Sequence, residues 1–556
     1  MAGLESDRSA ILRLADAMLR DDNFFFEFPN HTRDLDRVWE FDPIEKRYWP
    51  RRHYTERKLH DRDTPHDAKI VFEINRFKDL PILGQAALLT GEKKYAAEVE
   101  RRLLSWIEGN PFASTVNWSS ALEISIRIIA WTTTLLLLKK AGFPTSEHPK
   151  IARSIYEQIL YLSADLSTDR VVPINHLIGE ATGLFAATAL WEFTEAERYA
   201  AQARRILERE IIRQTFPDGV TREASSCYHQ FVTHFFDLAD RIATSHDHPF
   251  SQQYKVRLSN MKSFLESMTM DSQVVRFGDA DDGWALWLEG DRDAWKSFLF
   301  GPASTLATKP LLSSYPSAQI VAAHLPNAFL FLRAGAFGMG GSGFSSHAHD
   351  DFLSPIIYLA GRSILTDSGT FVYNGNPAAR DRYRLASSHN GLVVLADGEL
   401  PPTGPKPRAN FGWELVRPDA MLLGSTCTTS NATATAQYGE WPQHRRSIKI
   451  RSTSALIVDR FLQLIPGRAE WSLHLAPEWT MDTASSSSLN SGSHSFRNAS
   501  GDRLCITLHG KFDPINIEPY DFSLSYRVSQ SATMMKLSAS NPAGLFAILM
   551  TIDRAQ

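Results

Sequence analysis

The sequence predicts a multidomain α+β chain in which antiparallel helix pairs, arranged as a bundle or toroid, come before a large antiparallel β-sandwich. From about residue 76 to residue 300, apolar residues recur every three or four positions, as in amphipathic helices. From about residue 328, short segments alternate apolar and polar residues between turn residues, which indicates strands. The length of 556 residues allows two or more domains and excludes a peptide hormone, a small binding module and a disulfide-stapled scaffold.

The helical half is a series of helix, turn and helix. The first pair is predicted over residues 80–110, where the periodic pattern closes with Gly109 and Asn110. No fixed-period repeat is visible, so a bundle or toroid is favoured over a solenoid of copied units. The same rhythm returns over residues 120–142, 148–166, 176–193 and 195–214.

The second half is predicted to form antiparallel hairpins. A proline-containing linker is expected over residues 301–326, and an extended arm before residue 76, where aromatic and charged residues mix without periodicity. The alternating segments are residues 328–335, 354–369, 390–398, 445–464, 470–477 and 503–510. The predicted domains are therefore an arm over 1–75 that packs on the helical domain, the helical domain over 76–310 and a sandwich over 311–556.

Composition and charge are those of an ordinary globular protein, with 43% hydrophobic and 22% charged residues. The net charge of -4 gives no bulk attraction to nucleic acid or an anionic membrane, so an acidic partner would need a local basic groove. Cys227, Cys427 and Cys505 lie far apart, which predicts buried thiols and no disulfide framework or zinc ribbon.

The amino terminus has no uninterrupted apolar stretch after a basic start, so it does not resemble a secretory signal. The longest apolar run, Ile128 to Leu138, is too short for a membrane span, and no membrane insertion is expected. The expected location is the cytoplasm, or the periplasm if a signal has been removed. The sequence gives no indication of an oligomeric state.

The densest group of chemically active residues is GSGFSSHAHDD over residues 341–351. His347 and His349 would share one face if this segment is extended. With Asp367 and His389 further on, two imidazoles and a carboxylate make a reasonable zinc set. Spacing alone nevertheless favours the ordinary alternative of surface or hydrogen-bonded histidines.

The helical half holds a second set. INHLIGE contains Asn175, His176 and Glu180, and DGVTREASSCYHQF contains Arg222, Glu223, Tyr228 and His229. These residues alone favour a structural role over a catalytic site. Asn175 would cap a helix start, His176 and Glu180 would pair on one helix face, and Tyr228 would be a core residue. RFGDADDGW, residues 276–284, lacks the spacing of an EF-hand, so a tight turn is favoured over a calcium loop.

Seven strings change this balance because they occur together and in order. They are NRFKDLPIL, NWSSALEISIRIIAW, INHLIGE, DGVTREASSCYH, FGDADDGW, HAHDDFLSPIIYLAGRSILTDSGT and RYRLASSHNGLVV. Their order and approximate spacing resemble the heparinase II/III-like polysaccharide lyases over roughly residues 70–400. The resemblance implies an α/α toroid followed by an antiparallel β-sandwich. It also implies cleavage of a uronic-acid-containing acidic polysaccharide by β-elimination, which leaves an unsaturated uronide end.

The resemblance implies roles for four residues. Elimination removes the weakly acidic C5 proton beside a carboxylate, so the carboxylate charge must first be neutralised by hydrogen-bond donors. Asn175 matches the neutralising residue, with His176 adjacent, and Tyr228 matches the catalytic tyrosine. His347 matches the second acid/base group, used when the proton and the leaving group lie on opposite faces. Because a phenol is a poor base at neutral pH, Tyr228 needs cationic neighbours, for which Arg222 and His229 are the local candidates.

The resemblance also implies a metal site formed by His349, Asp367 and His389. A structural zinc ion is expected, with manganese or calcium as alternatives, and no organic cofactor. Arg222, Glu223, Arg380 and Arg384 are the expected substrate-binding residues, and Arg382 adds to the local basic surface. The alternative to substrate contact is a solvated basic loop.

This chain departs from the family pattern in two respects. The family often has alanine after the histidine that matches His349 and an acidic residue after the alanine. In this chain Asp350 follows His349, and Asp351 keeps the acidic position. The missing secretion signal suggests a bacterial exopolysaccharide as substrate beside a heparan-sulfate-like one. Two other functions stay open: a glycoside hydrolase that uses Glu223 with Asp279 or Asp281, and a non-catalytic glycan-binding protein of polysaccharide production.

Overall fold

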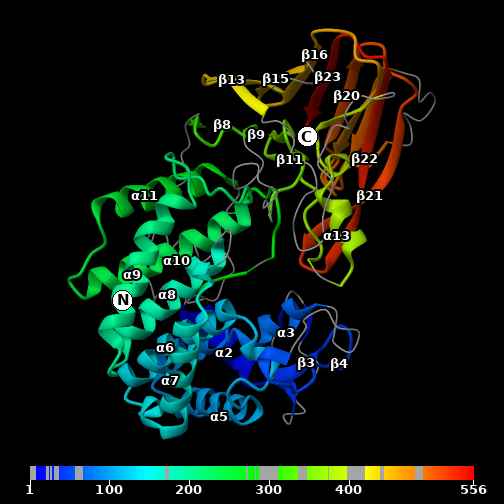
Figure 1. The fold of residues 1–556 in the computed structure, drawn as a ribbon. Helices are drawn as coiled ribbons and strands as arrows, with labels where there is room; N and C mark the ends of the chain where they lie inside the picture. Colours follow the sequence, from blue (N-terminus) through cyan, green and yellow to red (C-terminus); the bar gives the residue numbers. More distant parts are fainter. Residues whose placement is uncertain are drawn as a thin grey trace.

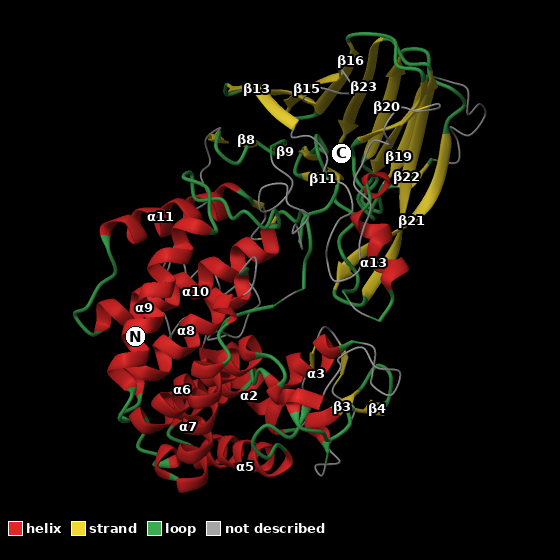
Figure 2. Cartoon of the chain, viewed as in Figure 1, coloured by secondary structure: helices red, strands yellow, loops and turns green. Residues whose placement is uncertain are grey.

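The predicted change from helices to strands is confirmed by the computed structural model, which places helices in one half and antiparallel strands in the other (Figure 1 and Figure 2). The structure describes residues 8–20, 24–25, 28–29, 37–56, 67–169, 174–270, 273–281, 283–286, 311–335, 347–373, 375–396, 420–438, 444–482 and 492–555. Residues 301–310 of the predicted linker and residues 341–346 of the histidine motif lie outside the described residues.

The helical half is built from two layers. The inner helices are α4 (Leu80–Thr90), α6 (Ala121–Lys140), α8 (Asn175–Leu190) and α10 (Ser226–Ser245), each packed on the next. Most residues of α6 and α8 are buried, as expected of inner helices, whereas α9 buries only one face. The outer helices are α5 (Lys93–Gly109), α7 (Pro149–Ala164), α9 (Ala196–Arg213) and α11 (Gln252–Ser267).

Helix α6 is longer than the apolar run that the sequence shows, and by length and composition alone it could cross a membrane. Within the protein, 83% of its most apolar 18-residue window is buried. Its polar residues Glu123 and Arg127 are also buried and have hydrogen-bond partners in the toroid. Helix α6 is therefore a core helix of the toroid.

The amino-terminal segment was predicted as an extended arm that packs on the helical domain, but it contains helices and is not extended throughout. The amino-terminal segment starts with helix α2 (Arg8–Leu19), whose Ile11, Ala15 and Met18 pack into the core of the toroid. It ends with helix α3 (Ala68–Asn75), which Asp67 caps by accepting a hydrogen bond from the Lys69 amide. Between them lies the short pair β3 (Phe41–Asp42) and β4 (Arg47–Tyr48).

The described residues of the β half form three main antiparallel sheets. The first has the order β11-β10-β9-β8-β7, the second β12-β17-β22-β21, and the third β13-β14-β15-β16-β23-β20-β19-β18. The strands of the first sheet are β7 (Leu311–Tyr315), β8 (Ile320–Leu325), β9 (Ala328–Arg333), β10 (Ile356–Leu359) and β11 (Arg362–Leu365). Strands β7 and β8 lie inside the segment predicted as a linker, so that prediction is wrong for residues 311–325.

The second and third sheets form the large sandwich seen in the upper part of Figure 1. The second contains β12 (Leu392–Ala396), β17 (Gly467–His474), β21 (Asn516–Ser525) and β22 (Val528–Ser540). The third contains β13 (Ala420–Cys427), β14 (Ala432–Tyr438), β15 (His444–Arg451), β16 (Ser454–Phe461), β18 (Thr480–Met481), β19 (Ser493–Arg497), β20 (Arg503–His509) and β23 (Gly544–Asp553). Alternate residues of β15 and β16 are buried, in agreement with the predicted alternation.

The three cysteines are free, as predicted, but each is partly exposed and not buried.

Polar contacts join the two halves where the predicted site residues lie. The Ala280 amide donates a hydrogen bond to Thr370 Oγ1 (2.7 Å), and the Asp279 amide donates to the His347 carbonyl (2.9 Å). A second connection runs from Asp67 beside α3 to the turn between β21 and β22, where Tyr526 and Arg527 donate to its carboxylate. The β half is thus hydrogen-bonded both to the toroid and to the amino-terminal segment.

Candidate active site

Tyr228 and His347 form the centre of the candidate site. Tyr228 lies in the first turn of α10, which Ser225 caps because its Oγ accepts a hydrogen bond from the Tyr228 amide (3.1 Å). His347 comes from the β half and its ring stacks on Tyr228, with 3.5 Å between ring centroids and 12° between ring planes. Two groups that can carry protons thus meet from opposite halves of the protein.

Asn175 lies beside this pair as the first residue of α8. Its side chain does not cap the helix as the alternative interpretation expected. Instead, the Asn175 amide and Nδ2 each donate to one oxygen of the Glu223 carboxylate, both at 2.8 Å. A carboxylate at a helix amino terminus is favourable because the amide groups and the helix dipole are positive there. His347 Nε2 lies 3.5 Å from both Asn175 Nδ2 and Glu223 Oε2.

The structure corrects the expected cationic neighbours of Tyr228. His229 is buried, and burial lowers its pKa to about 4, so its ring is neutral at pH 7. Arg222 lies over the ring of Phe216, with 4.4 Å from its Cζ to the ring centroid. Arg76, a residue that the sequence did not single out, interacts electrostatically with Tyr228.

Tyr228 itself is a neutral phenol in this environment. Burial raises the pKa of Tyr228 well above its usual value of 10.0, and the charges of Asp281 and Asp279 add to this effect. A hydrogen bond with Tyr373 opposes the increase in pKa. Tyr228 therefore holds its proton at neutral pH, which suits a proton donor.

Asp279 is the most connected residue of the site. Its carboxylate has three partners: His347 Nδ1 at 3.0 Å, His349 Nε2 at 2.9 Å and Arg380 Nη2 at 2.9 Å. Burial opposes ionisation of Asp279, but Arg380 and the two histidines outweigh it and hold the pKa of the carboxyl well below its usual range. The string FGDADDGW, predicted as a tight turn, therefore contributes Asp279 to the site.

Asp281, from the same string, belongs to a buried group of charges beside the site. Lys69 Nζ lies 3.0 Å from Asp281 and 2.9 Å from Glu73. Arg76 donates two hydrogen bonds of 2.7 Å to Glu123, whose carboxylate also interacts electrostatically with His176. Glu180, expected to pair with His176, accepts hydrogen bonds from the amide and Oγ of Ser167.

The predicted basic surface of Arg380, Arg382 and Arg384 is wrong for two of these residues. Arg380 and Arg384, in and at the end of helix α13 (Pro377–Arg384), are 5% and 1% exposed. Arg380 binds Asp279, and burial lowers the pKa of Arg384 to about 10. Only Arg382 is half-exposed, and it pairs with Asp521 at 2.7 Å. A basic surface cannot be formed by guanidinium groups that the fold has already buried and paired.

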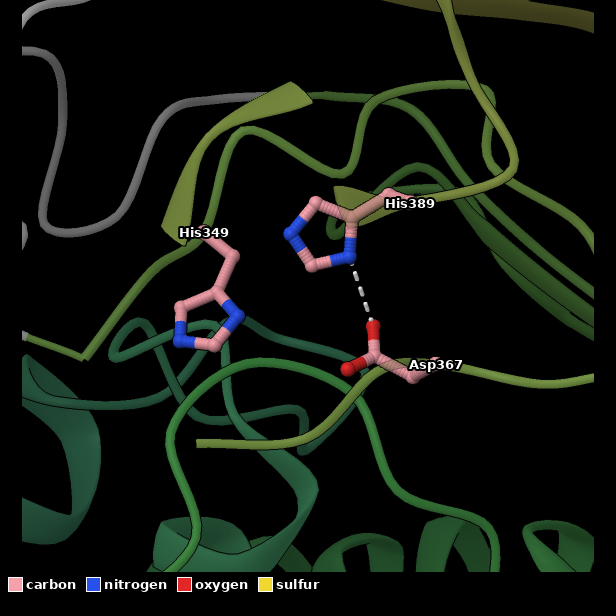
Figure 3. A group of neighbouring side chains, drawn as sticks. All are labelled: His349, Asp367 and His389. Carbon is pink, nitrogen blue, oxygen red and sulfur yellow. Dashed lines mark hydrogen bonds and ion pairs between the residues drawn. The ribbon is translucent and has the colours of Figure 1, made fainter. Parts of the chain in front are cut away.

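His349, Asp367 and His389 lie together (Figure 3), and one ligand atom from each lies within 4.8 Å of the others. His349 Nε2 also contacts Asp279. All three are buried, and His389 Nδ1 is 2.9 Å from Asp367 Oδ2. His349 Nδ1 and His389 Nε2 are buried and have no hydrogen-bond partner among the described residues. Figure 3 shows one ring nitrogen of His349 facing the other two residues.

These residues fit a divalent metal ion. Two neutral imidazoles and an ionised carboxylate are common zinc ligands. Burial opposes ionisation of Asp367, but His389 outweighs it and lowers the pKa of the carboxyl, so the ligand is available in its charged form. An imidazole nitrogen that is buried without a partner is costly, and a metal ion would satisfy it.

Sequence reasoning missed Tyr373 and Arg76, and considered Asp279 only as part of a turn or as a carboxylate of the hydrolase alternative. Tyr373 is buried, with its ring centroid 6.1 Å from that of His347 and 6.5 Å from that of Tyr228. The string FGDADDGW could have indicated Asp279, because its aspartates follow a glycine within a motif shared with the family. The partners of that carboxylate lie 68 to 101 residues away, and no local pattern encodes them.

Family models match both halves of the chain. The family model described as "Heparinase II/III N-terminus" matches residues 8–298, and the model "Heparinase II/III-like, C-terminal" matches residues 307–543. A heparin-sulfate lyase of Pedobacter heparinus is 24% identical over 363 residues, which are 59% of this chain and 52% of that protein. The chain therefore spans about half the length of the curated relatives it matches.

Solved structures show the same fold at low sequence identity. The crystal structure of a heparan sulfate lyase from Pedobacter heparinus has a TM-score of 0.60 at 20% identity and covers 98% of this chain and 83% of its own. The crystal structure of heparinase III has a TM-score of 0.67 at 15% identity, with 97% and 89% covered. These similarities confirm the predicted architecture of an α/α toroid followed by a β-sandwich.

Proposed function

Because the chain belongs to the heparinase II/III family, we propose that it is a polysaccharide lyase that cleaves a uronic-acid-containing acidic polysaccharide by β-elimination. The observation that carries this proposal is the stacked pair of Tyr228 and His347 beside the Asn175 amide. An elimination needs a base, an acid and a group that neutralises the substrate carboxylate. These three residues supply all of them.

Asn175 is the group that neutralises the uronate. One N–H of its Nδ2 is held by Glu223, and Nδ2 lies 3.5 Å from His347 Nε2, a long contact that the substrate carboxylate would replace. Charge that develops on the carboxylate as the C5 proton leaves is then stabilised by a donor that is already oriented. His176, half-buried on the next position of α8, is a second donor for the same group.

The proton transfers are divided between the stacked rings. His347 Nε2 accepts the C5 proton, and the electrons of the C5–H bond form the C4–C5 double bond. The C4–O bond breaks, and the departing O4 takes the proton of the Tyr228 hydroxyl. The raised pKa of Tyr228 supports this division because the resting residue is a phenol. For a uronate whose proton and leaving group lie on the same face, Tyr228 would have to serve as both base and acid.

We propose a structural zinc ion at His349, Asp367 and His389, with manganese and calcium as the alternatives. A bound ion would join the loops that carry these residues and would not touch the substrate. We expect about one zinc ion per chain by elemental analysis, and its loss in His389→Ala together with a lower melting temperature. Wild-type protein that holds no metal after incubation with zinc would contradict this proposal.

The substrate class is an acidic polysaccharide that contains uronic acid. The relatives are named for heparin sulfate and heparan sulfate, and a bacterial exopolysaccharide is the other class that the sequence suggests. The buried and paired state of Arg380 and Arg384 gives no separate support for a sulfated polymer. The polymer must therefore be found by a screen.

The glycoside hydrolase alternative is not favoured. It requires two carboxyl groups, one of which keeps a proton to protonate the leaving group. The Asp279 and Asp281 carboxylates are each bound to cationic side chains, which lower their pKa values below the usual range. Burial raises the pKa of Glu223, but both of its oxygens accept hydrogen bonds from Asn175, which favour the ionised form.

The experiment is a screen of uronate polymers, sulfated and unsulfated, that follows the ultraviolet absorbance of the unsaturated uronide. Wild-type protein should produce it from at least one polymer, and Tyr228→Phe should lower kcat at least about 10²-fold on that polymer. Tyr254→Phe is the matched control, because this buried tyrosine of the toroid donates only to the Phe236 carbonyl. Saturated ends would indicate a hydrolase, and polymer binding without turnover by wild type would indicate a glycan-binding protein.

A further inference from the structure

We infer that Asp279 is a positioning residue whose single carboxylate fixes both the acid/base histidine His347 and the metal ligand His349, so that the metal site and the proton-transfer site are mechanically coupled. This inference rests on the proposed function for the role of His347. The geometry itself does not depend on that role. It consists of two hydrogen bonds that two histidines, two positions apart, donate to one buried carboxylate.

The two oxygens of Asp279 serve different histidines. Oδ2 is 3.0 Å from His347 Nδ1, and Oδ1 is 2.9 Å from His349 Nε2. An ionised carboxylate can only accept hydrogen bonds, so each histidine must carry its proton on the nitrogen that faces Asp279. The side chain is 0% exposed, so water does not compete for these contacts.

The other nitrogen of each ring is thereby left with a lone pair. On His347 this is Nε2, which lies near Asn175 Nδ2, where the uronate is proposed to bind. On His349 it is Nδ1, which faces Asp367 and His389 (Figure 3). One carboxylate therefore selects a tautomer suited to proton acceptance in one ring and a tautomer suited to metal binding in the other.

The main chain holds Asp279 firmly in this position. Its amide donates to the His347 carbonyl at 2.9 Å, and its carbonyl accepts from Ser225 Oγ at 2.6 Å. The same Ser225 Oγ accepts from the Tyr228 amide, so one hydroxyl links the Asp279 backbone to the first turn of α10. Arg380 Nη2 adds a third contact to Oδ2 at 2.9 Å.

Gly278 makes this close approach possible. Its φ of +66° is in the left-handed region, and a Cβ at this position would lie 2.9 Å from Ser225 Cα and 3.0 Å from the His347 carbonyl. The backbone before Asp279 is thus pressed between the cap of α10 and the histidine loop. If Asp279 moves with one histidine, its hydrogen bond to the other histidine must change as well.

The direct test is Asp279→Asn, because an amide offers only one acceptor oxygen and one of the two histidines must lose its partner. Zinc affinity is measured by competition with a chromophoric chelator, and we expect it to fall about 10- to 100-fold. On a polymer that the wild type cleaves, kcat should fall about 10²-fold, because His347 is misplaced. KM should change little, because Asn175, which is proposed to donate a hydrogen bond to the substrate carboxylate, keeps its position.

Asp281→Asn is the matched control for the zinc measurement. Asp281 is buried on the same string, and its described partners are Lys69, Gly283 and Cys227. Its substitution should leave the zinc affinity within about twofold of wild type. An equal loss of affinity in both variants would overturn the inference, because it would reflect general loosening of the string.

A second measurement needs neither substitution of Asp279 nor activity. Nitrogen-15 spectra of wild-type protein labelled at histidine, with His347 assigned by the signals lost in His347→Gln, report which ring nitrogen is protonated. We expect protonated Nδ1 on His347, and a shift of its signals when zinc is removed by a chelator. Signals of His347 that do not change on zinc removal would overturn the coupling, even if Asp279→Asn fails to fold.

The outcomes separate this inference from the proposed function. If no polymer is cleaved but zinc removal still shifts the His347 signals, the positioning role stands and the lyase proposal fails. If a polymer is cleaved and Asp279→Asn keeps wild-type zinc affinity and kcat, the lyase proposal stands and the positioning role is wrong.

Discussion

At the scale of single residues, the contact between Asn175 and Glu223 shows how a local motif acquires its chemistry. The sequence indicates Asn175 as the start of a helix, 48 residues before Glu223 in the chain. In the structure, Glu223 accepts from both the amide and the side chain of Asn175, which fixes the direction of the proposed uronate donor. Glu223 was expected to bind substrate, but its two oxygens already have partners inside the protein.

We predict that Glu223→Gln lowers kcat about 10²- to 10³-fold, because a glutamine has one acceptor oxygen and cannot hold both Asn175 donors. Glu180→Gln is a close control. Glu180 lies on α8, the helix that starts at Asn175, is as buried as Glu223 and accepts from the amide and the hydroxyl of Ser167. Both variants should lose about 1–3 kcal/mol of stability, and only Glu223→Gln should lose activity. Equal activities of the two variants would contradict this role of Glu223.

At the same scale, His229 and Arg380 show why charge cannot be assigned from sequence. Both stand next to motif residues, and both were expected to present positive charge to the site. His229 Nδ1 accepts from the Thr221 amide, and burial keeps the ring neutral. Arg380 is charged but binds Asp279. Whether a basic residue adds to a substrate-binding surface depends on burial and partners, which a motif does not contain.

At the scale of elements, strands β15, β16 and β17 support the proposed metal site from inside the sandwich. The buried Asp459 carboxylate accepts from His444 Nε2, from Arg446 Nε and Nη2, and from Trp471 Nε1, at 2.7 to 2.9 Å. Arg446 Nη1 in turn donates to the carbonyls of Leu353 and Asn390. Asn390 follows the expected ligand His389, and Leu353 lies in the loop after His349.

We predict that Asp459→Asn lowers the stability of the sandwich by about 3–5 kcal/mol, because it leaves the Arg446 guanidinium buried without its counter-charge. Glu470→Gln on β17 is the control, since its partner Arg468 is half-exposed and such pairs contribute about 0–1 kcal/mol. The measurement is chemical denaturation followed by tryptophan fluorescence. A loss in Glu470→Gln as large as in Asp459→Asn would contradict the prediction.

The ion pair of Asp459 and Arg446 also predicts how the stability of the protein changes with pH. Burial opposes ionisation of Asp459, but Arg446 and His444 outweigh it and hold its pKa far below the usual value of 3.8. A lowered pKa in the folded state means that the contribution of Asp459 is fully present above about pH 4 and is lost as the pH falls further. Wild-type protein should therefore lose stability below about pH 4 more steeply than Asp459→Asn.

At the scale of the whole molecule, the amino-terminal segment and the end of the sandwich are joined around the site. Arg527, in the turn between β21 and β22, donates to Asp67 from Nε and Nη2 at 3.2 and 2.8 Å. Tyr526 donates to the same carboxylate at 2.8 Å, and its hydroxyl accepts from the Tyr373 amide. Figure 1 shows this turn region of β21 and α13 facing α3 and β3. Segments 460 residues apart thus meet beside Tyr373.

We predict that Arg527→Ala lowers the stability of the protein by about 1–3 kcal/mol, because it removes a charged partner of the fully buried Asp67 carboxylate. Arg382→Ala, which breaks an exposed pair with Asp521 on the same side of the sandwich, should cost no more than about 1 kcal/mol. Thermal unfolding of the two variants measures the difference. Equal midpoints would show that the contact of Arg527 with Asp67 does not hold the two parts together.

The sequence by itself determined the helical first half, the β second half and most element positions, because periods of 3.6 and 2 residues are local properties of the chain. It also placed Asn175, Tyr228 and His347 in one family motif series. The tertiary structure decided which charges face each other, because the partners are far apart: 172 residues separate Asn175 from His347, and 68 separate Asp279 from His347. Burial then settled which histidines are neutral and which arginines are already paired, since both depend on the surroundings of a side chain and not on its neighbours in sequence.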